Sequence, residues 1–267
     1  GGVSMEGVDV EDAVKKIRGP KGSEVVIEYI RPPSNVKKNI TVTRDTIIIP
    51  STQEKVLTGG IGYLEVAFFG DHTTDEFQKS IQNLTQSGVQ GIILDFRNNG
   101  GGFLDTAVDL LGFFLPENSK AVTTRENNAR LDHTFYTRTM KIPHTRVPIV
   151  MLVNELSASA TEIVAGALQD HGRAIIVGTK TYGKGSVQTP FFLEDNSIIK
   201  ITIGKWYTPK DRGIDGDGIT PDITSTLTDE DYQKKNDQQL EDAKKIIQSL
   251  VQKQGNIPAV ISLYSKK

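Results

Sequence analysis

Residues 147–168 read VPIVMLVNELSASATEIVAGAL, and this stretch decides the fold. The apolar run Val147–Val153 is typical of a buried strand, and from Ala160 onward apolar side chains recur at helical spacing. A polar turn lies between the two. A buried strand that leads through a turn into a helix is half of a βαβ unit. The stretch therefore predicts an α/β protein.

The alternation of strand and helix patterns continues on both sides of this stretch. We predict strands at Ile61–Phe69, Gly91–Asp95 and Ala174–Val177, and helices at Thr74–Ser87 and Leu104–Phe114. Strands that alternate with helices are joined by right-handed crossovers into a largely parallel sheet. In such sheets, binding and catalysis gather on loops beyond the carboxyl ends of the strands.

Other parts of the sequence carry weaker patterns. Residues 186–208 alternate like antiparallel strands, residues 228–254 are spaced like one polar helix, and residues 116–146 are typical of exposed strands or loops. Near the start, a helix is predicted at Val10–Ile17.

Two strands are predicted next, at Glu24–Arg31 and Lys37–Thr43. Three elements make a very small core, so we expect this N-terminal piece to pack on the rest or to lack its own beginning. The chain opens Gly-Gly-Val-Ser-Met, and we expect a fragment or a processed chain.

Composition excludes several classes of protein. The 267 residues contain 31 Lys and Arg against 33 Asp and Glu, which argues against binding to nucleic acid through bulk charge. Cysteine is absent, which excludes disulfides, Cys-ligated metals and thiol nucleophiles. No apolar run approaches the roughly 18 residues that a membrane helix needs.

Ser159 is the strongest candidate for a nucleophile. It lies at the predicted strand-to-helix transition, where free N–H groups and the helix dipole can stabilise an oxyanion. The commoner explanation of the local pattern is a helix cap, in which Ser157 or Ser159 forms a capping box with Glu162. The Gly-x-Ser-x-Gly elbow of α/β-hydrolases is not present.

A serine nucleophile needs a base, and the histidines are poorly placed for that role. The four are His72, His133, His144 and His171, and the last is better explained as a cap at the end of the Ser159 helix. Lys184, in a Gly-Lys-Gly turn, is the best alternative, and Gln188 could orient its amine. A lysine base must be desolvated to be neutral. An exposed loop lysine is the commoner situation.

Glycines near these residues allow further interpretations. Residues 178–184 match the phosphate-loop pattern Gly-x4-Gly-Lys, but Gly185 replaces the Ser or Thr that ligates magnesium, and a strand pattern follows. Gly100–Gly102 follow a buried strand, and their N–H groups could form half of an oxyanion hole with that of Ala160, or the run could be a flexible turn. Residues 211–222 resemble a calcium loop only loosely, and a plain turn is favoured.

Five ordered motifs resemble those of the carboxyl-terminal processing proteases, also called tail-specific proteases, which are PDZ-containing serine peptidases. They are Gly62–Leu64, Asp95–Gly102, Ser157–Ile163, Gly183–Gln188 and Gly218–Asp222. Residues 4–23 are similar to the second half of the family's PDZ domain. The resemblance implies a crotonase/ClpP-like ββα protease core at residues 46–267, including the C-terminal helix, after a partial PDZ domain at residues 1–45 that looks N-terminally truncated.

The resemblance also implies roles for five residues. Ser159 would be the nucleophile, Lys184 the general base and Gln188 the residue that positions Lys184. The N–H groups of Gly101 and Ala160 would form the oxyanion hole. No metal and no cofactor is implied.

The function that the resemblance implies is that of a serine endopeptidase cleaving polypeptides near their C-termini through an acyl-enzyme. Two alternatives stay open: a latent or inactive peptide-binding or scaffold protein of the same fold, and a crotonase-like acyl-transfer enzyme. Expected partners are polypeptides bound by their C-terminal tails, with a homo-oligomer as a possible assembly and no nucleic acid. The expected location is extracytoplasmic, in a periplasm, cell envelope or plastid lumen.

Overall fold

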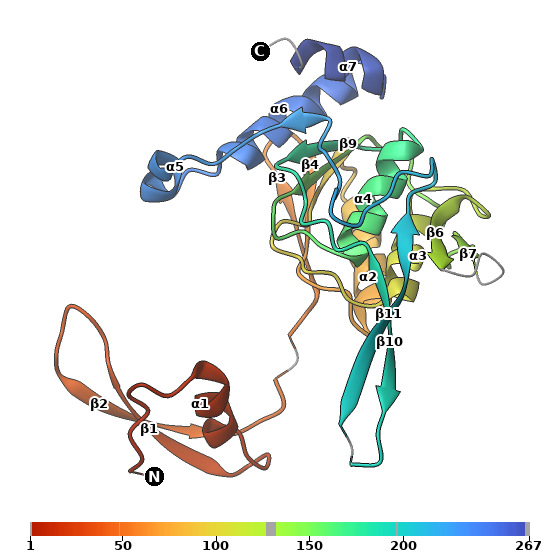
Figure 1. The fold of residues 1–267 in the computed structure, drawn as a ribbon. Coiled ribbons are helices and arrows are strands. Elements are labelled where there is room, and N and C mark those ends of the chain that lie inside the picture. Colours follow the sequence, from red (N-terminus) through yellow and green to blue (C-terminus); the bar gives the residue numbers. More distant parts are fainter. Residues whose placement is uncertain (1, 48, 127–131, 196, 265–267) are drawn as a thin grey trace. The chain divides into compact units, whose positions relative to one another are not determined.

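The computed structural model describes residues 2–47, 49–126, 132–195 and 197–264. The chain divides into two compact units between Ile49 and Pro50 (Figure 1). The division lies a few residues after the domain boundary predicted between residues 45 and 46. That the first unit is part of a PDZ domain stays a prediction.

The N-terminal unit contains one helix and one hairpin. Helix α1 (Val10–Ile17) begins after Asp9, whose carboxylate accepts a hydrogen bond from the Glu11 N–H at 2.8 Å. Strand β1 (Glu24–Ile30) pairs antiparallel with β2 (Lys37–Thr43). All three elements lie where the sequence predicts them. No described residue of this unit is fully buried.

The second unit is built around a six-stranded sheet with the order β12-β9-β8-β5-β4-β3. Its strands are β3 (Thr52–Leu57), β4 (Ile61–Val66), β5 (Gly91–Asp95), β8 (Ile149–Val153), β9 (Ile175–Gly178) and β12 (Ile223–Thr224). Strands β4, β5, β8, β9 and β12 run parallel, which confirms the predicted parallel sheet. The antiparallel edge strand β3 was not predicted from the sequence.

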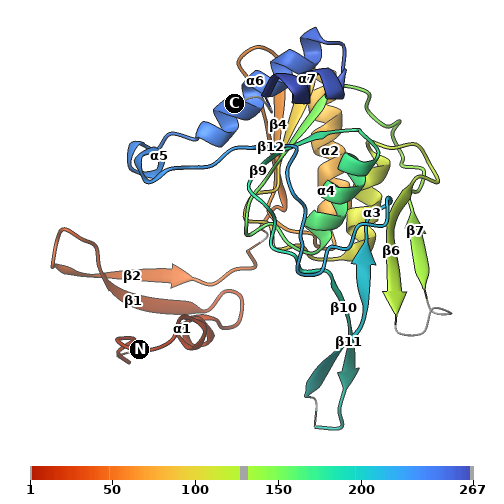
Figure 2. The same cartoon turned by 45° about the horizontal axis from the view of Figure 1, so that its top comes forward.

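Helices cover both faces of this sheet (Figures 1 and 2). Helices α2 (Thr73–Gln86), α3 (Leu104–Gly112) and α4 (Ala160–Asp170) belong to one side, and α6 (Gln238–Gln252) and α7 (Ile257–Tyr264) to the other. Successive strand residues point to opposite faces. In β5, Ile92 and Leu94 therefore join one core cluster, and Ile93 joins the other.

A second, four-stranded antiparallel sheet has the order β10-β11-β6-β7. Its strands are β6 (Lys120–Glu126), β7 (His133–Tyr136), β10 (Ser186–Phe192) and β11 (Ile198–Tyr207). The β10–β11 hairpin confirms the antiparallel prediction for residues 186–208 and extends away from the helices in Figures 1 and 2. Strand β6 was predicted as an exposed strand or loop, but four of its residues are buried.

The prediction of one helix over residues 228–254 is wrong. The segment forms two helices, α5 (Asp229–Lys234) and α6, and the shorter α7 follows. The helical conformation is interrupted at Lys235, which has a positive φ of 52°. Asp237 then starts α6, because its carboxylate accepts a hydrogen bond from the Leu240 N–H at 3.0 Å.

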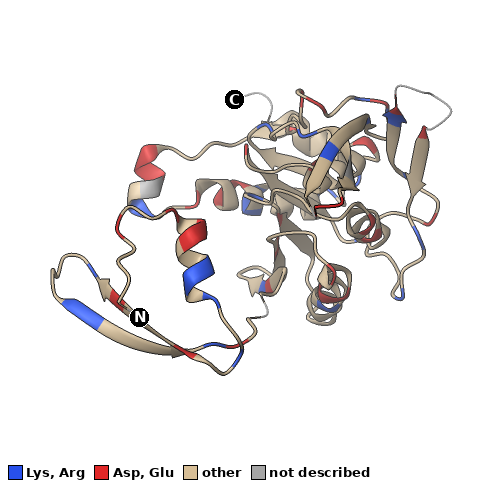
Figure 3. Cartoon of the chain, turned by 60° about the horizontal axis from the view of Figure 1, so that its bottom comes forward, with Lys and Arg blue, Asp and Glu red and all other residues tan. Residues whose placement is uncertain are grey.

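Charged residues are interspersed along the chain rather than collected in one segment (Figure 3). Both α1 and α5 carry acidic residues in the first turn and lysine in the last turn, which complements the helix dipole. Within the described residues, no helix combines the length and apolar character that a membrane crossing requires.

Candidate functional site

Ser159 lies in a sharp turn between the carboxyl end of β8 and the start of α4. Its backbone has φ 57° and ψ −116°. A non-glycine residue in such a conformation stores strain of about 1–3 kcal/mol, and strain of this kind collects at functional sites. The strained backbone of Ser159 thus supports its choice as the candidate nucleophile, and the sequence pattern could not show this strain.

Ser157 fixes the first half of the turn. Its buried hydroxyl donates to the Phe96 carbonyl at 2.8 Å and accepts from the Asn154 N–H at 2.9 Å. Phe96 follows β5 and Asn154 follows β8, so one hydroxyl joins the ends of two neighbouring strands. Ser157 thus has a structural role, and Ser159 is the residue that caps α4.

The Glu162 carboxylate ties the Ser159 turn to the loop that carries Lys184. It is completely buried. It accepts four hydrogen bonds at 2.6–2.9 Å, from the N–H groups of Ser159, Gly183 and Lys184 and from the Thr181 hydroxyl. Charge-assisted bonds of this number offset the cost of burying a carboxylate. The two loops are consequently held against one another through a single side chain.

Only the hydrogen bond to the Ser159 N–H was predicted from the sequence, as part of the capping box. The other three donors belong to a segment 19 to 22 positions later in the chain. The sequence carries no local signal for this contact, because it depends on how β9 and the loop after it pack beside α4.

Lys184 has a fixed backbone and a free side chain. Its N–H is bound to Glu162 at 2.9 Å, but the residue is exposed. Over the residues that the structure describes, its ammonium forms neither a hydrogen bond with Ser159 nor an ion pair. A lysine base works when it is neutral, and burial favours the neutral form. The structure therefore brings the two loops together without joining the two reactive groups.

Gln188 is also exposed, and it lies on β10. The pairing of β10 with β11 shifts register between Val187 and Gln188. Such a bulge redirects side chains and is common beside active sites. In this conformation no contact between Gln188 and Lys184 is observed among the described side chains.

Gly101 lies directly against the Ser159 turn. A Cβ added to it would come within 2.8 Å of the Ser159 Cβ and 3.0 Å of the Ala160 nitrogen, and its φ is +98°. Both facts require glycine here. The Ala160 N–H is the first of α4, so it has no partner within the helix. Gly101, Ser159 and Ala160 thus lie against one another, and that they form an oxyanion site stays a prediction.

Asn99 holds this glycine loop in place. Its side-chain amide donates to the Val66 carbonyl at 2.7 Å, and its side-chain oxygen accepts from the Gly101 N–H at 2.9 Å. Its backbone carbonyl accepts from the Ala158 N–H at 3.0 Å and from the Thr161 hydroxyl at 2.9 Å. The Gly101 N–H is therefore already engaged and would have to be shared or released to serve an oxyanion.

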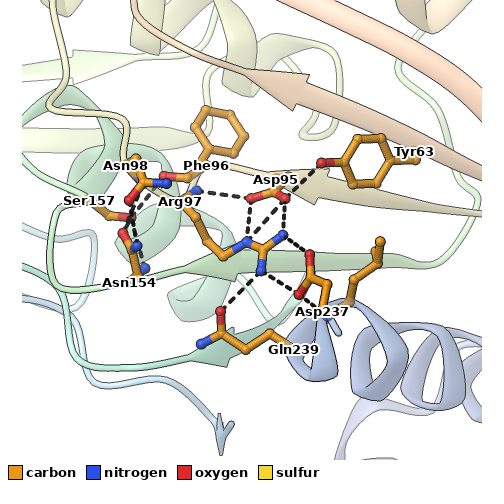
Figure 4. A network of polar contacts seen from close by, with 10 residues as sticks. Tyr63, Asp95, Phe96, Arg97, Asn98, Asn154, Ser157, Asp237 and Gln239 are labelled. Atoms are coloured by element: carbon orange, nitrogen blue, oxygen red, sulfur yellow. Dashed lines mark hydrogen bonds and ion pairs between the residues drawn. The ribbon is translucent and has the colours of Figure 1, made fainter. Parts of the chain in front are cut away.

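Arg97 is the centre of a second polar network, at the carboxyl end of β5 (Figure 4). Its guanidinium binds Asp95 at 2.6 Å and both oxygens of Asp237 at 2.7 Å, and Gln239 accepts from it at 3.1 Å. Tyr63 donates to Asp95 at 2.8 Å. The sequence placed Arg97 and Asp95 in a motif but missed that the start of α6 binds Arg97.

These contacts shift the pKa values of the groups involved. Burial lowers the pKa of Arg97, but its two carboxylate partners outweigh that and raise it above the ordinary value. Burial alone would raise the pKa of Asp237, but the hydrogen bonds from Arg97 bring it below the ordinary value of 3.8. Burial, followed by the charge of Asp95, raises the pKa of Tyr63. The network is thus stable as an ionised cluster.

Two asparagines join this network to the Ser159 turn. The Asn98 N–H donates to the Asn154 side-chain oxygen at 2.8 Å, and the Asn154 amide donates to the Asn98 side-chain oxygen at 2.8 Å (Figure 4). Beside them lies a cavity of about 470 Å³, lined by Tyr63 and Arg97 among others. Its lining does not include Ser159, so it neighbours the candidate site without containing it.

The competing interpretations find little support in the geometry. Strand β10 begins at Ser186, so the phosphate-loop pattern is not followed by the helix that it needs. His171 is the C-cap of α4, as predicted, and its Nε2 lies 2.8 Å from the Lys120 carbonyl oxygen. Asp211 of the loose calcium-loop pattern pairs with Lys120 and Arg125.

Comparisons with known proteins agree with this geometry. Residues 60–225 match the model of peptidase family S41. The chain is 34% identical over 225 residues to the carboxy-terminal processing protease CtpB of Bacillus subtilis, covering 83% of this chain and 46% of that protein. It is 37% identical over 226 residues to the carboxy-terminal-processing protease of Bartonella bacilliformis, covering 83% and 51%. The chain thus spans about half the length of these relatives.

Solved structures share the fold. The photosystem II D1 C-terminal processing protease matches with a TM-score of 0.60 and 29% identity, over 84% of this chain and 61% of that chain. Mature CPAF matches with a TM-score of 0.65 over 96% and 74%, at 16% identity, a likeness that concerns the fold alone.

Proposed function

The chain belongs to peptidase family S41, and from this premise we propose that it acts as a serine endopeptidase cleaving polypeptides near their C-termini. The observation that carries the proposal is the Glu162 carboxylate, which binds the backbone of both the Ser159 turn and the Lys184 loop. The names of the relatives, which are carboxyl-terminal processing proteases, support the same reaction.

In the proposed reaction, the Ser159 hydroxyl attacks the scissile carbonyl and neutral Lys184 takes its proton. The oxyanion accepts hydrogen bonds from the N–H groups of Ala160 and Gly101. Lys184 then protonates the departing amine, which leaves an acyl-enzyme. Water attacks the ester with the same lysine as base, and Ser159 is regenerated. Gln188 would position Lys184. No step requires a metal or a cofactor.

The exposed side chain of Lys184 favours a resting conformation, in which the backbone of the site is assembled and the dyad is not. This is the specific observation in favour of the latent alternative. Catalysis then needs the lysine side chain to turn inward and the Gly101 N–H to become available. Hydrogen bonds of catalytic groups often tighten only when substrate is bound.

Partners and location complete the proposal. Polypeptides are the substrates, and we propose that their C-terminal tails bind to the N-terminal unit, if that unit is part of a PDZ domain. An extracytoplasmic location and assembly into a homo-oligomer are proposed from the family resemblance.

The test is cleavage of a peptide panel with free C-termini, with product masses locating the cut. Ser159→Ala should reduce kcat by about 10⁶-fold, to background, because the nucleophile is lost. Ser87→Ala, an exposed serine after α2, is the control and should retain full activity. Retained cleavage by Ser159→Ala would exclude this serine as the nucleophile.

A further inference from the structure

A second cavity lies at the edge of the central sheet opposite to Ser159. Its volume is about 560 Å³. Its lining includes Gln90, Pro148 and Arg173. Gln90 directly precedes β5, Pro148 directly precedes β8, and Arg173 lies two residues before β9. Parallel strands all start at one edge of a sheet and end at the other, and the Ser159 turn follows the end of β8. The cavity is therefore separate from the candidate catalytic site.

The charged lining of this cavity is of one sign. The charges are those of Arg146 and Arg173. His144 and His171 also line the cavity, and no Asp or Glu is among the described residues that line it. Neither arginine has a carboxylate within ion-pair distance in the part of the chain that the structure describes. The cavity therefore offers an anion two arginines without a carboxylate partner.

Arg173 is partly buried. Its guanidinium donates to the carbonyl oxygens of Phe114 at 3.1 Å, Thr145 at 2.7 Å and Val147 at 2.9 Å. These neutral acceptors do not compensate its charge, and burial lowers the pKa of Arg173 to about 10. An anion in the cavity would supply the missing compensation, because charge-assisted bonds to guanidinium are strong.

The rest of the cavity wall is largely apolar. Leu250 and Val251 of α6 and Ile257 of α7 form one part of it, and Phe114 and Pro148 belong to another. The volume lies within the range of about 300–1,000 Å³ that is usual for small-ligand sites. A ligand that fits would therefore carry a negative group and an apolar body.

We propose that this cavity binds a carboxylate that terminates an apolar chain. The carboxylate would lie against Arg173 and Arg146, and the apolar chain against α6 and α7. Two sources share this chemistry, a fatty carboxylate and the free C-terminus of a peptide that ends in apolar residues. The proposal does not depend on the peptidase activity.

Decanoate, below its micelle concentration, is the first probe. Calorimetry at low ionic strength should give saturable binding with one site. The methyl signals of Ile149 and Ile257, both in the lining, should shift in NMR spectra. N-methyl decanamide, which has the same chain without charge, should bind at least tenfold more weakly. Equal binding of the amide, or no shift at these isoleucines, would overturn the proposal.

Variants locate the anion contact. Arg146→Gln should weaken decanoate binding about fivefold, since Arg146 is exposed and ion pairs of this kind are modest. Arg173→Gln should weaken it about tenfold or more. Because Arg173 also binds three carbonyls, Arg173→Gln could perturb the fold. Its affinity is therefore used only if its circular dichroism spectrum is native, and if it is not, Arg146→Gln alone tests the proposal. Lys79→Gln on α2 is the control and should bind as the wild type does. Unchanged affinity of Arg146→Gln would refute the assignment.

A peptide competition distinguishes the two sources. A hexapeptide ending in Leu-Val with a free C-terminus should displace decanoate if peptide tails are the natural ligand, and its C-terminal amide should not. If neither peptide competes while decanoate binds, the fatty carboxylate is the source. Failure of both decanoate and the free peptide to bind would contradict the proposal.

Discussion

The two loops that would supply the catalytic dyad differ in how far the fold fixes them. Three contacts fix the Ser159 turn. The Ser157 hydroxyl binds the Phe96 carbonyl, Gly101 packs against the turn, and Glu162 accepts from the Ser159 N–H. The Lys184 loop is fixed only in its backbone, through the same Glu162, while the lysine side chain is exposed.

This difference separates two tasks of the site. In the proposed reaction the nucleophile needs a rigid, strained turn, and the fold already holds Ser159 in one, whereas the Gly101 N–H is still bound to Asn99. The base needs desolvation as well as position, and its desolvation is not complete in this conformation. In the proposed reaction, substrate binding would complete the desolvation of Lys184.

The largest effect should come from removing the base. Lys184→Ala should lower kcat by about 10²–10⁴-fold, because general-base catalysis is lost while the oxyanion site remains. The neighbouring Lys180→Ala is a matched control, since Lys180 is an exposed lysine of the same loop, and its kcat should stay within about twofold. Peptide cleavage under single-turnover conditions measures both. Equal losses in the two variants would show that the loop's charge matters rather than this lysine.

A smaller effect is expected from Glu162→Gln. The amide keeps one acceptor but turns its NH₂ toward two N–H donors, which leaves buried donors unsatisfied. We expect a loss of about 3 kcal/mol in the free energy of unfolding, together with a fall in kcat. Denaturant unfolding and peptide cleavage measure the two effects.

Glu155→Gln is the matched control, because Glu155 is an exposed carboxylate close by that binds the Thr179 hydroxyl. It should change stability by no more than about 0.5 kcal/mol. If Glu162→Gln also proved neutral, the carboxylate would not be what joins the two loops.

The smallest effect concerns the Arg97 network and depends on pH. The pKa of Asp237 is lowered in the folded protein, so its ionised form stabilises the fold above the ordinary value of 3.8, and this contribution is lost as the pH falls through the folded pKa. Asp237→Asn should be less stable than the wild type by about 1 kcal/mol at pH 7, since Asp237 is partly exposed.

The difference between wild type and Asp237→Asn should shrink toward zero as the pH falls below about 4, because the wild-type carboxyl is then protonated. Urea unfolding at a series of pH values measures it. A stability difference that stayed constant between pH 7 and pH 3 would argue that the carboxylate charge is not what binds Arg97.

The sequence predicted elements with a clear local signal. Strand β5 has the predicted bounds, because Gly91–Asp95 is an apolar run with a polar segment after it. Strand β3 was missed, because Thr52–Leu57 is an edge strand with a mostly polar sequence. The helix over residues 228–254 was predicted without its break at Lys235. No local pattern predicts that Asp237, which starts α6, binds Arg97, 140 positions earlier in the chain.

In the candidate site, too, some features have a local sequence signal and others depend on distant parts of the chain. Ser159, Ala160 and the run Gly100–Gly102 could be proposed from a strand, a glycine run and a helix start, Gly101 within that run is what the family resemblance implies, and the fold brings Gly101, Ser159 and Ala160 together. Apart from the capping-box bond of Glu162 to the Ser159 N–H, the contacts that position them could not be proposed, because Gly183 and Lys184, which bind Glu162, lie in a segment that is distant in sequence. The conformation of the Lys184 side chain also has no sequence signal.

The most direct test of the central claim is covalent labelling by a fluorophosphonate, with the modified residue identified by mass spectrometry. A fluorophosphonate reacts with a serine only when its hydroxyl is activated and an oxyanion site is present. The account predicts one modified residue, Ser159, and labelling at least 100-fold slower in Lys184→Ala. Labelling of another serine, or an undiminished rate in Lys184→Ala, would contradict the account.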